Sequence, residues 1–272
     1  MTHEPPPLPL NFHKKSILLF VFLGTFFIAN AIIAEFVGVK VFSVERTLGF
    51  APLNYPLLDT LNISLNMTAG ALLWPLVFVM TDIINEYYGT RGVKFLSYLA
   101  VGLICYAFTM IYLSIQLAPA DFWIIRQGNE GTINMDLAFQ AVLGQGLWII
   151  LGSLVAFVLG QWVDVGIFHK IKKYTGEKYL WLRATGSTLV SQFIDSFVVL
   201  FISFHLNPAT NWDLKTILIM GLVKYFYKFI IALLMTPVLY GVHIAIDYYL
   251  GEPLATHLKE RAMNNREPFS HP

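Results

Sequence analysis

The chain has 272 residues, of which 56% are hydrophobic and only 13% are charged, about half the charged share that is usual in soluble proteins. A soluble fold of this size needs more charged side chains to cover its surface. The single cysteine, Cys105, excludes a disulfide framework and a cysteine-ligated metal site. The net charge of +1 gives no reason to expect a nucleic-acid partner. Together these features predict an integral membrane protein.

Six apolar segments are each long enough to cross a hydrocarbon core of ~30 Å as a helix. They are too continuous for the strands of a β-barrel, which alternate apolar and polar residues. We expect the first segment to stay in the membrane rather than be cleaved as a signal peptide, because its apolar run continues through Ala34. We therefore predict an all-α bundle of six transmembrane helices, forming a single domain over residues 17–250, with approximate spans 17–34, 68–88, 95–117, 138–165, 184–204 and 217–246.

The positions of Lys and Arg predict that both ends of the chain are cytoplasmic. Of the 18 basic residues, 12 fall in the segments on the side of the two termini, four fall on the opposite side, and two lie inside the sixth span. Residues 1–16 are expected to form a flexible cytoplasmic N-terminus, and residues 251–272 a flexible cytoplasmic tail. The long external connection Glu35–Met67 is expected to carry a short element of its own.

Polar side chains inside the predicted spans are the candidate functional residues, because each charge costs roughly 2.5–3.5 kcal/mol near the bilayer centre. In the second span, Asp82, Asn85 and Glu86 share one helical face, and in the fourth span Gln161 and Asp164 do the same. The remaining candidates are Asn30 in the first span, Ser187, Gln192 and Asp195 in the fifth, and Lys228 in the sixth.

Each candidate also has a structural interpretation. Asp195 and Lys228 could be an ion pair that ties two helices together, and Glu86 and Asp164 lie near the inner interface, where lysines could satisfy them. Hydroxyls such as Ser187 often serve only helix packing. The convergence of carboxylates, amides and lysines from four spans in one layer favours a binding function.

The known catalytic motifs are missing from the sequence, so we predict no enzyme, no catalytic residue, no cofactor and no metal ligand. An ATP-binding motif is also missing, which means that any transport is secondary or is energised by another subunit. Besides the uptake of one specific solute, two other functions stay open. One is a transporter of another small solute, such as a purine or a vitamin, and the other is a non-transporting membrane binder or scaffold.

Four segments carry a specific pattern of polar residues in a fixed order. They are Met80–Gly89 (MTDIINEYYG), Leu159–Lys170 (LGQWVDVGIFHK), Leu182–Phe204 with its STLVSQFIDSF, and Gly221–Gly241 (GLVKYFYKFIIALLMTPVLYG). The pattern resembles the queuosine-precursor transporters, which are vitamin-uptake-type proteins of the bacterial inner membrane. The resemblance covers the second to the sixth span, roughly Trp74 to Val242, and fits the first span more loosely through Asn30.

The resemblance implies uptake of 7-deazaguanine bases, such as 7-cyano-7-deazaguanine or its aminomethyl analogue, for making queuosine in tRNA. It implies a multi-pass protein of the bacterial inner membrane whose partners are a small deazapurine and the lipid bilayer. It also implies a six-helix fold similar to the substrate-binding subunits of energy-coupling-factor transporters. The oligomeric state and any energising subunit are left open. Lys224 and Glu86 occupy positions that vary in the family.

The chemistry of a deazaguanine suits the candidate residues. Its N1–H and 2-amino edge presents two donors, which match a carboxylate, so we expect this edge to be bound by Asp82, Asp164 or Asp195. Its carbonyl needs a donor, which could be Lys228, Asn30 or a glutamine amide. The flat ring needs an apolar slot, for which the candidates are Trp162, Phe193 and Tyr225.

Overall fold

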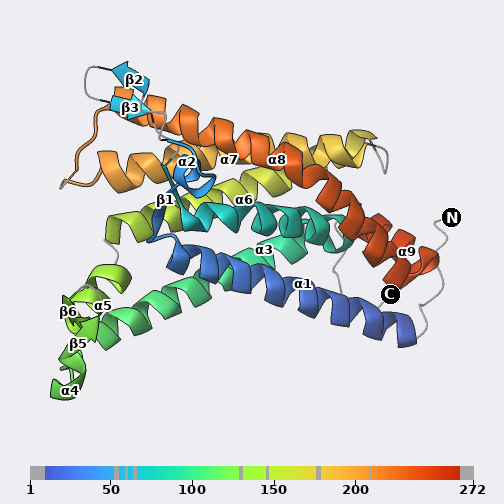
Figure 1. Cartoon of the computed structure of the whole chain (residues 1–272). Helices are drawn as coiled ribbons and strands as arrows, with labels where there is room; N and C mark the ends of the chain where they lie inside the picture. The colour runs from blue at the N-terminus through green and yellow to red at the C-terminus, as the bar shows by residue number, and fades with distance from the viewer. Residues whose placement is uncertain are drawn as a thin grey trace. The chain divides into compact units, whose positions relative to one another are not determined.

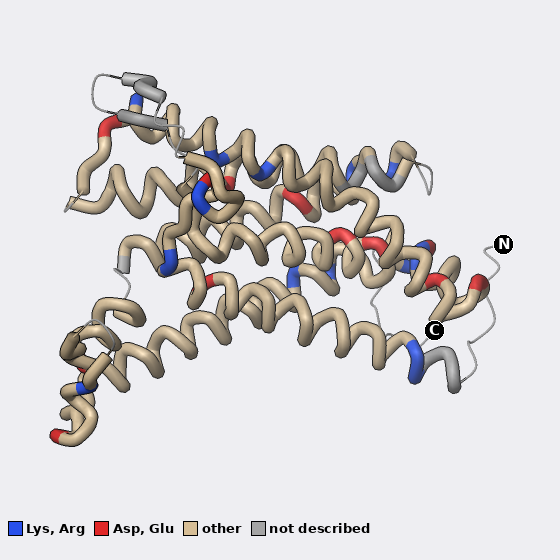
Figure 2. Tube along the Cα trace, in the orientation of Figure 1, with Lys and Arg blue, Asp and Glu red and all other residues tan. Residues whose placement is uncertain are grey.

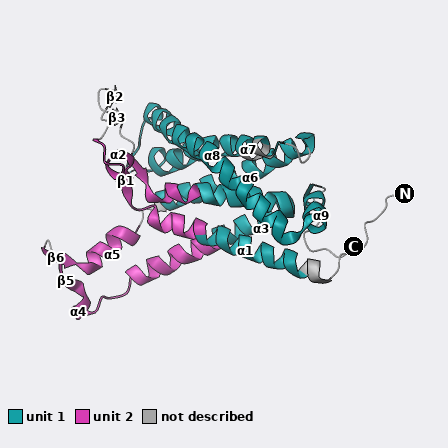
Figure 3. Cartoon of the chain, turned by 45° about the vertical axis from the view of Figure 1, so that its right-hand side comes forward, with its two compact units in different colours: residues 1–29, 75–101, 147–272 teal, residues 30–74, 102–146 magenta. Residues whose placement is uncertain are grey.

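The computed structural model describes residues 10–51, 55–58, 61–63, 66–128, 131–144, 147–175, 179–208 and 210–263. Within these residues the chain is mainly helical, and its strands form three two-stranded antiparallel sheets in the connections between helices (Figure 1). The predicted all-α class is thereby confirmed for the membrane helices. The chain divides into two compact units, which are coloured in Figure 3. Unit 1 holds residues 1–29, 75–101 and 147–272, and unit 2 holds residues 30–74 and 102–146.

Several helices are long and apolar enough to cross a membrane, which makes the chain a multi-pass membrane protein. Among the described residues there are five such segments, namely Lys14–Val37, Ala69–Ile115, Met135–Thr175, Thr185–His205 and Leu214–Leu250. Large apolar side chains such as Phe22, Phe226 and Ile244 are exposed along them. Exposed apolar surface of this extent is typical of helices that face lipid.

The second and third predicted spans form one continuous element, α3 (Trp74–Ile115), rather than two helices with a loop between them. The helix is broken at Gly89, whose backbone angles (φ 70°, ψ −176°) are accessible only to glycine. A Cβ on Gly92 would lie 3.8 Å from Cγ2 of Ile84, whereas a straight helix separates positions eight residues apart by about 12 Å. The chain therefore reverses direction at Gly89, and residues 90–94, which fall between the second and third predicted spans, are helical.

The fourth predicted span, residues 138–165, also differs from the structure. It falls on two helices, α5 (Met135–Leu143) in unit 2 and α6 (Leu147–Thr175) in unit 1. Gly144 ends α5. The helix α6 continues ten residues past Val165, where the fourth predicted span ends. The remaining long helices, α1 (Leu10–Val37), α7 (Leu180–Leu200) with the π-helix η2 (Phe201–His205), and α8 (Leu214–Leu250), contain the spans predicted for them.

Unit 1 is held together by close helix packing and by a few hydrogen bonds between helices. The Tyr88 hydroxyl of α3 donates to the carbonyl oxygen of Ser16 in α1 at 2.7 Å, and the Phe27 and Phe157 rings join α1 to α6. Along α6 and η2, Ser203 Oγ donates to the carbonyl oxygen of Trp148 at 3.2 Å. These contacts fix α6 between its neighbours, so that one face of α6 is turned away from solvent.

The expected flexible tail after residue 251 is wrong for the part that the structure describes. Residues Glu252–Met263 form the helix α9, in which Leu254, Ala255, Leu258 and Ala262 are buried. Their spacing of three and four residues places them on one helical face. A Cβ on Gly89 would lie 3.1 Å from the carbonyl oxygen of Ala262, so the end of α9 packs directly on the turn of α3.

Unit 2 contains the long connection between α1 and α3 and a shorter connection between α3 and α5. In the long connection β1 (Val41–Ser43) pairs antiparallel with β4 (Asn66–Thr68), and β2 (Tyr55–Leu58) with β3 (Leu61–Ile63). The short helices α2 (Val44–Thr47) and η1 (Ala69–Leu72) lie beside these strands in sequence, so the connection has the short element expected for it. The shorter connection is formed by α4 (Asp121–Ile124), β5 (Ile125–Gly128) and β6 (Gly131–Asn134).

Candidate functional site

Charged residues interrupt the helices of unit 1 instead of being confined to their ends, as Figure 2 shows. On α3, four polar residues in succession along one face are buried, with at most 4% of each side chain exposed: Thr81, Asp82, Asn85 and Glu86. Positions separated by three and four residues share a helical face, so the turns of α3 place these groups together. Thr81 Oγ1 donates to the Gln161 side-chain oxygen at 3.1 Å, which links α3 to α6.

The opposing face of α6 is also polar and buried. Gln161 and Asp164 are 1% and 0% exposed, one turn apart, and Phe168 continues the same face without exposure. The third side of this arrangement is α7, where Ser187, Thr188, Ser191 and Gln192 are buried. We call Thr81, Gln161, Asp164 and these four α7 residues the polar cluster.

Hydroxyl groups of α7 hold one oxygen of the Asp164 carboxylate. Ser191 Oγ and Thr188 Oγ1 donate to Asp164 Oδ1 at 3.2 and 3.4 Å, and Ser187 also hydrogen-bonds to this side chain. The carboxylate is thereby fixed in orientation. Its second oxygen, Oδ2, has no hydrogen-bond partner among the described residues.

Two other side-chain atoms of the polar cluster also have no hydrogen-bond partner in the described part of the chain. They are the side-chain nitrogens of Gln161 and Gln192, which are donors. Leaving a buried donor or acceptor unsatisfied costs about 1–3 kcal/mol, and more for a charged group, so such atoms are expected to meet a bound molecule or water. One carboxylate oxygen and two amide donors on adjacent helices can bind a small planar molecule that offers both donors and acceptors.

Asp195 and Lys228 form a hydrogen-bonded ion pair between α7 and α8. Their side chains are 19% and 13% exposed, so this pair is less buried than the polar cluster. Gly160 of α6 lies close to it, since a Cβ there would be 3.6 Å from the Asp195 Cβ. The pair is therefore adjacent to the helix that carries Gln161 and Asp164.

Glu86 is paired with a residue that sequence reasoning missed. The Lys172 ammonium lies 3.1 Å from the Glu86 carboxylate and donates to the Glu86 carbonyl oxygen at 3.0 Å, and both side chains are 1% exposed. Lys172 lies beyond the fourth predicted span, which ends at residue 165, among the basic residues on the side of the termini. Its spacing of eleven residues from Gln161, about three helical turns, places it on the buried face of α6 and was the signal available in the sequence.

Two sets of candidates are placed elsewhere. Asn30 is buried on α1 and belongs to unit 2, whereas the polar cluster belongs to unit 1. Trp162 and Phe193 are each 45% exposed. Side chains this exposed do not enclose a flat ring, so these two residues do not form the expected slot. Phe193 instead packs edge-on against Tyr225, with ring centroids 5.3 Å apart. The buried aromatic rings on the polar face of α6 are Phe157 and Phe168.

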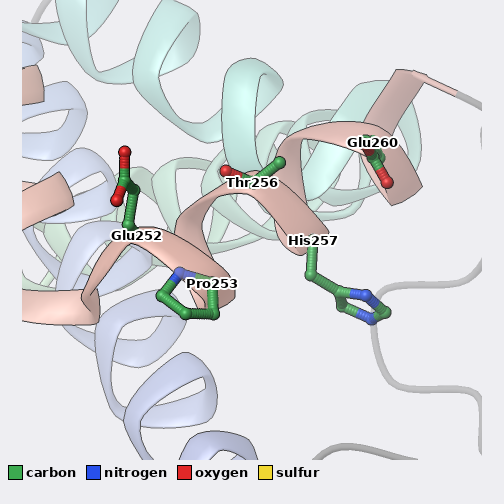
Figure 4. A pocket seen from close by; sticks show the side chains of 5 residues that line it. All are labelled: Glu252, Pro253, Thr256, His257 and Glu260. Carbon is green, nitrogen blue, oxygen red and sulfur yellow. The ribbon is translucent and has the colours of Figure 1, made fainter. Parts of the chain in front are cut away.

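A separate depression lies on α9, lined by Glu252, Pro253, Thr256, His257 and Glu260 (Figure 4). It belongs to the surface of one short helix and includes no residue of the polar cluster. Among the described residues, no group of three or more His, Cys, Asp or Glu side chains could hold a metal ion.

Comparisons with known proteins place the polar cluster in a wider context. Residues 68–242 match a family model described as "Putative vitamin uptake transporter", and this range contains the whole polar cluster. A protein of Bacillus subtilis (strain 168) named "Probable queuosine precursor transporter" is 27% identical over 199 residues, which cover 71% of this chain and 80% of that protein.

Two further relatives match at a similar level. The "Probable queuosine precursor transporter" of Haemophilus influenzae (strain Rd) is 25% identical over 187 residues, covering 66% of this chain and 69% of that protein. The "Queuosine precursor transporter" of Escherichia coli (strain K12) is 26% identical over 182 residues, covering 64% and 72%. No solved structure matches this chain at a significant level.

Proposed function

The chain belongs to the vitamin uptake transporter family, and from this premise we propose that it imports queuosine precursors across a bacterial inner membrane. The substrates are 7-cyano-7-deazaguanine or its aminomethyl analogue. The names of three relatives support this substrate class, and the match covers the helices that carry the polar cluster. Like them, the chain acts as a transporter.

In this proposal the chain crosses the membrane six times, with both termini in the cytoplasm. Two of the crossings come from α3, on either side of Gly89, because a continuous apolar segment of 47 residues would be about 70 Å long, more than twice the hydrocarbon thickness. The excess of Lys and Arg on the side of the termini supports the orientation. The turn at Gly89 and the helix α9 then lie on the cytoplasmic side.

The observation that carries the proposal is the set of buried, unsatisfied atoms in the polar cluster. A deazaguanine offers two donors on its N1–H and 2-amino edge and one acceptor on its carbonyl. Asp164 Oδ2 is an acceptor, and the side-chain nitrogens of Gln161 and Gln192 are donors, so the two sets of atoms are complementary. We assign the donor edge of the base to Asp164, whose carboxylate is oriented by the α7 hydroxyls.

The other candidates have supporting roles in this scheme. Ser187 orients the Asp164 carboxylate, and Asp82 lies on the α3 face that adjoins Gln161. Asp195 and Lys228 exchange their mutual contact for contacts with the substrate during transport. Glu86 is held by Lys172 and supports the turn of α3.

The experiment uses bacteria that cannot make the precursor and lack their own importer. The chain is expressed in them, 7-cyano-7-deazaguanine is fed at low concentration, and the queuosine content of tRNA is measured. We expect wild type to restore queuosine and Asp164→Ala to abolish the restoration while the protein remains in the membrane. Asp121→Ala is the matched control, because Asp121 is an exposed carboxylate of unit 2, and it should restore queuosine fully.

Two results would contradict the proposal. If the wild-type protein is abundant in the membrane and no queuosine appears, the chain does not import this substrate. If Asp164→Ala restores queuosine as well as Asp121→Ala does, the polar cluster is not the binding site.

A further inference from the structure

A second group of polar side chains in unit 1 forms a continuous hydrogen-bonded chain that links α3, α8 and α9. Lys259 Nζ of α9 lies 2.9 Å from Asp247 Oδ2, and the Tyr87 hydroxyl donates to Asp247 Oδ1 at 2.6 Å. The same hydroxyl lies 3.2 Å from Nδ1 of His243. The Tyr87 and His243 rings are also stacked, with centroids 5.4 Å apart.

The two ends of this chain differ in their access to solvent. The Asp247 side chain is 39% exposed, whereas His243 is 6% exposed inside α8. Tyr87, which joins them, is 1% exposed. A chain that connects an accessible carboxylate to a buried imidazole through one hydroxyl has the composition of a proton path.

The number of available protons fixes the direction of each hydrogen bond. Tyr87 has one hydroxyl proton, and the Asp247 carboxylate, paired with Lys259, can only accept, so Tyr87 donates to Asp247. The contact between Tyr87 and His243 then requires Nδ1–H of the imidazole as donor. Nε2 is therefore the nitrogen that gains or loses a proton when the ring changes charge.

We propose that His243, Tyr87 and Asp247, together with Lys259, form a proton relay that couples substrate uptake to the entry of a proton. A proton binds at Nε2 of His243, the Nδ1 proton passes to the Tyr87 oxygen, and the original Tyr87 proton passes to Asp247. One proton is moved, the imidazole ends neutral with its proton on Nε2, and Asp247 releases a proton to the cytoplasm. Rotation of the imidazole ring and of the Tyr87 hydroxyl then restores the starting arrangement with the proton on Nδ1. This inference rests on the proposed function and on the proposed orientation, which places Asp247 near the inner surface.

The surroundings of the relay contain few other charges that could take over its role. From α3 and α6 they are Glu86 and Lys172, which are paired with each other, and from α9 the only charge in direct contact with the relay among the described residues is Lys259. Glu86 precedes Tyr87 in the sequence and lies on the same buried stretch of α3 as Thr81 of the polar cluster. A change of charge at His243 is therefore expected to affect α3, the helix whose Thr81 hydrogen-bonds to Gln161.

The test uses the purified full-length protein in liposomes of phosphatidylethanolamine and phosphatidylglycerol, with labelled 7-cyano-7-deazaguanine as the probe. Exchange of labelled for unlabelled base is measured first, without any gradient, because it reports binding and translocation alone. Accumulation is then driven by an inside-alkaline pH gradient, with valinomycin and equal potassium on both sides to remove a membrane potential. One proton per base and a gradient of about one pH unit allow about 10-fold accumulation.

We expect wild type to exchange the base and to accumulate it in the gradient, with the accumulation lost on addition of a protonophore. His243→Gln cannot take up a proton, and Tyr87→Phe lacks only the hydroxyl, so both should keep exchange and lose accumulation. His257→Gln, a histidine of α9 outside the relay, is the matched control and should accumulate like wild type. A merely structural role of the relay would change the unfolding temperature without separating exchange from accumulation.

The possible results test the relay and the proposed function separately. Exchange without gradient-driven accumulation in wild type would overturn the relay and leave the proposed function standing. Accumulation by both His243→Gln and Tyr87→Phe at the wild-type level would also overturn it, because the proton would then pass elsewhere. If wild type shows no exchange at all, the proposed function fails and the relay fails with it.

Discussion

The polar cluster and the relay are both made of buried polar groups in unit 1, but they differ in how those groups are bonded. In the relay, Lys259, Asp247, Tyr87 and His243 contact one another in sequence. In the polar cluster, Asp164 Oδ2 and two glutamine nitrogens have no partner among the described residues. An unsatisfied buried group costs about 1–3 kcal/mol, so the polar cluster is expected to meet a bound molecule or water, whereas the contacts that define the relay are made within the protein.

The buried ion pair of Glu86 and Lys172 joins α3 to α6 through contacts within the protein. It is therefore expected to affect stability more than substrate binding. Asp164 is expected to show the opposite. The predictions below separate these two behaviours, starting with the largest expected effect.

Replacing Lys172 by Met should destabilise the protein by about 3–5 kcal/mol, because it leaves the buried Glu86 carboxylate without its counter-charge. The measurement is thermal unfolding in detergent. Lys170→Met is the matched control, because Lys170 is exposed on the same helix, and it should unfold like wild type. Equal unfolding temperatures for the two variants would show that the pair does not support the fold.

Replacing Gly89 by Ala should destabilise the turn of α3 by about 1–3 kcal/mol, because the residue has a positive φ and its added Cβ would meet Ala262 of α9. Gly102→Ala, farther along the same helix, has open space around it and should be neutral or stabilising. Limited proteolysis of α9 reports the local effect. If α9 in Gly89→Ala is as resistant as in Gly102→Ala, the close contact is not required.

A smaller, pH-dependent effect is expected at His257 on α9. Partial burial, together with the nearby Arg261, lowers the pKa of this imidazole below its ordinary value. The folded protein then binds this proton less tightly than the unfolded chain does, so stability is lost as the pH falls below about 6.5. The unfolding temperature of wild type should fall more between about pH 7.5 and 5.5 than that of His257→Gln. Parallel curves for the two proteins would contradict this.

Much of the polar cluster could be predicted from the sequence because it obeys helical periodicity. Gln161 and Asp164 of the cluster, and likewise Asp82 and Glu86 beside it on α3, are polar residues at spacings of three and four in apolar segments, and the structure buries all four. The unsatisfied state of Asp164 Oδ2 could not be predicted, since it depends on which α7 hydroxyls reach the other oxygen. The choice between Asp82, Asp164 and Asp195 therefore stayed open.

The errors of prediction have physical reasons as well. Lys172 was assigned to a cytoplasmic loop because lysines near the end of a span usually face water, whereas α6 continues to Thr175 and turns Lys172 inward. The sequence did not predict the helix α9 because half of its residues are polar, which is too few apolar residues for a membrane span, and only four of its residues are buried. The sequence predicts two spans on either side of Gly89 but not the tight turn that joins them, because hydropathy does not distinguish a loop from a tight turn between two helices.

The most direct test of the central assignment is the binding of 7-cyano-7-deazaguanine to the purified protein, compared with its analogue that lacks the 2-amino group. If Asp164 binds the donor edge, wild type should bind the analogue about 100-fold more weakly, which corresponds to about 3 kcal/mol for a hydrogen bond to a charged group. Asp164→Asn should bind both bases weakly and lose most of this discrimination. Equal affinity of wild type for the two bases, or unchanged discrimination in Asp164→Asn, would contradict the assignment.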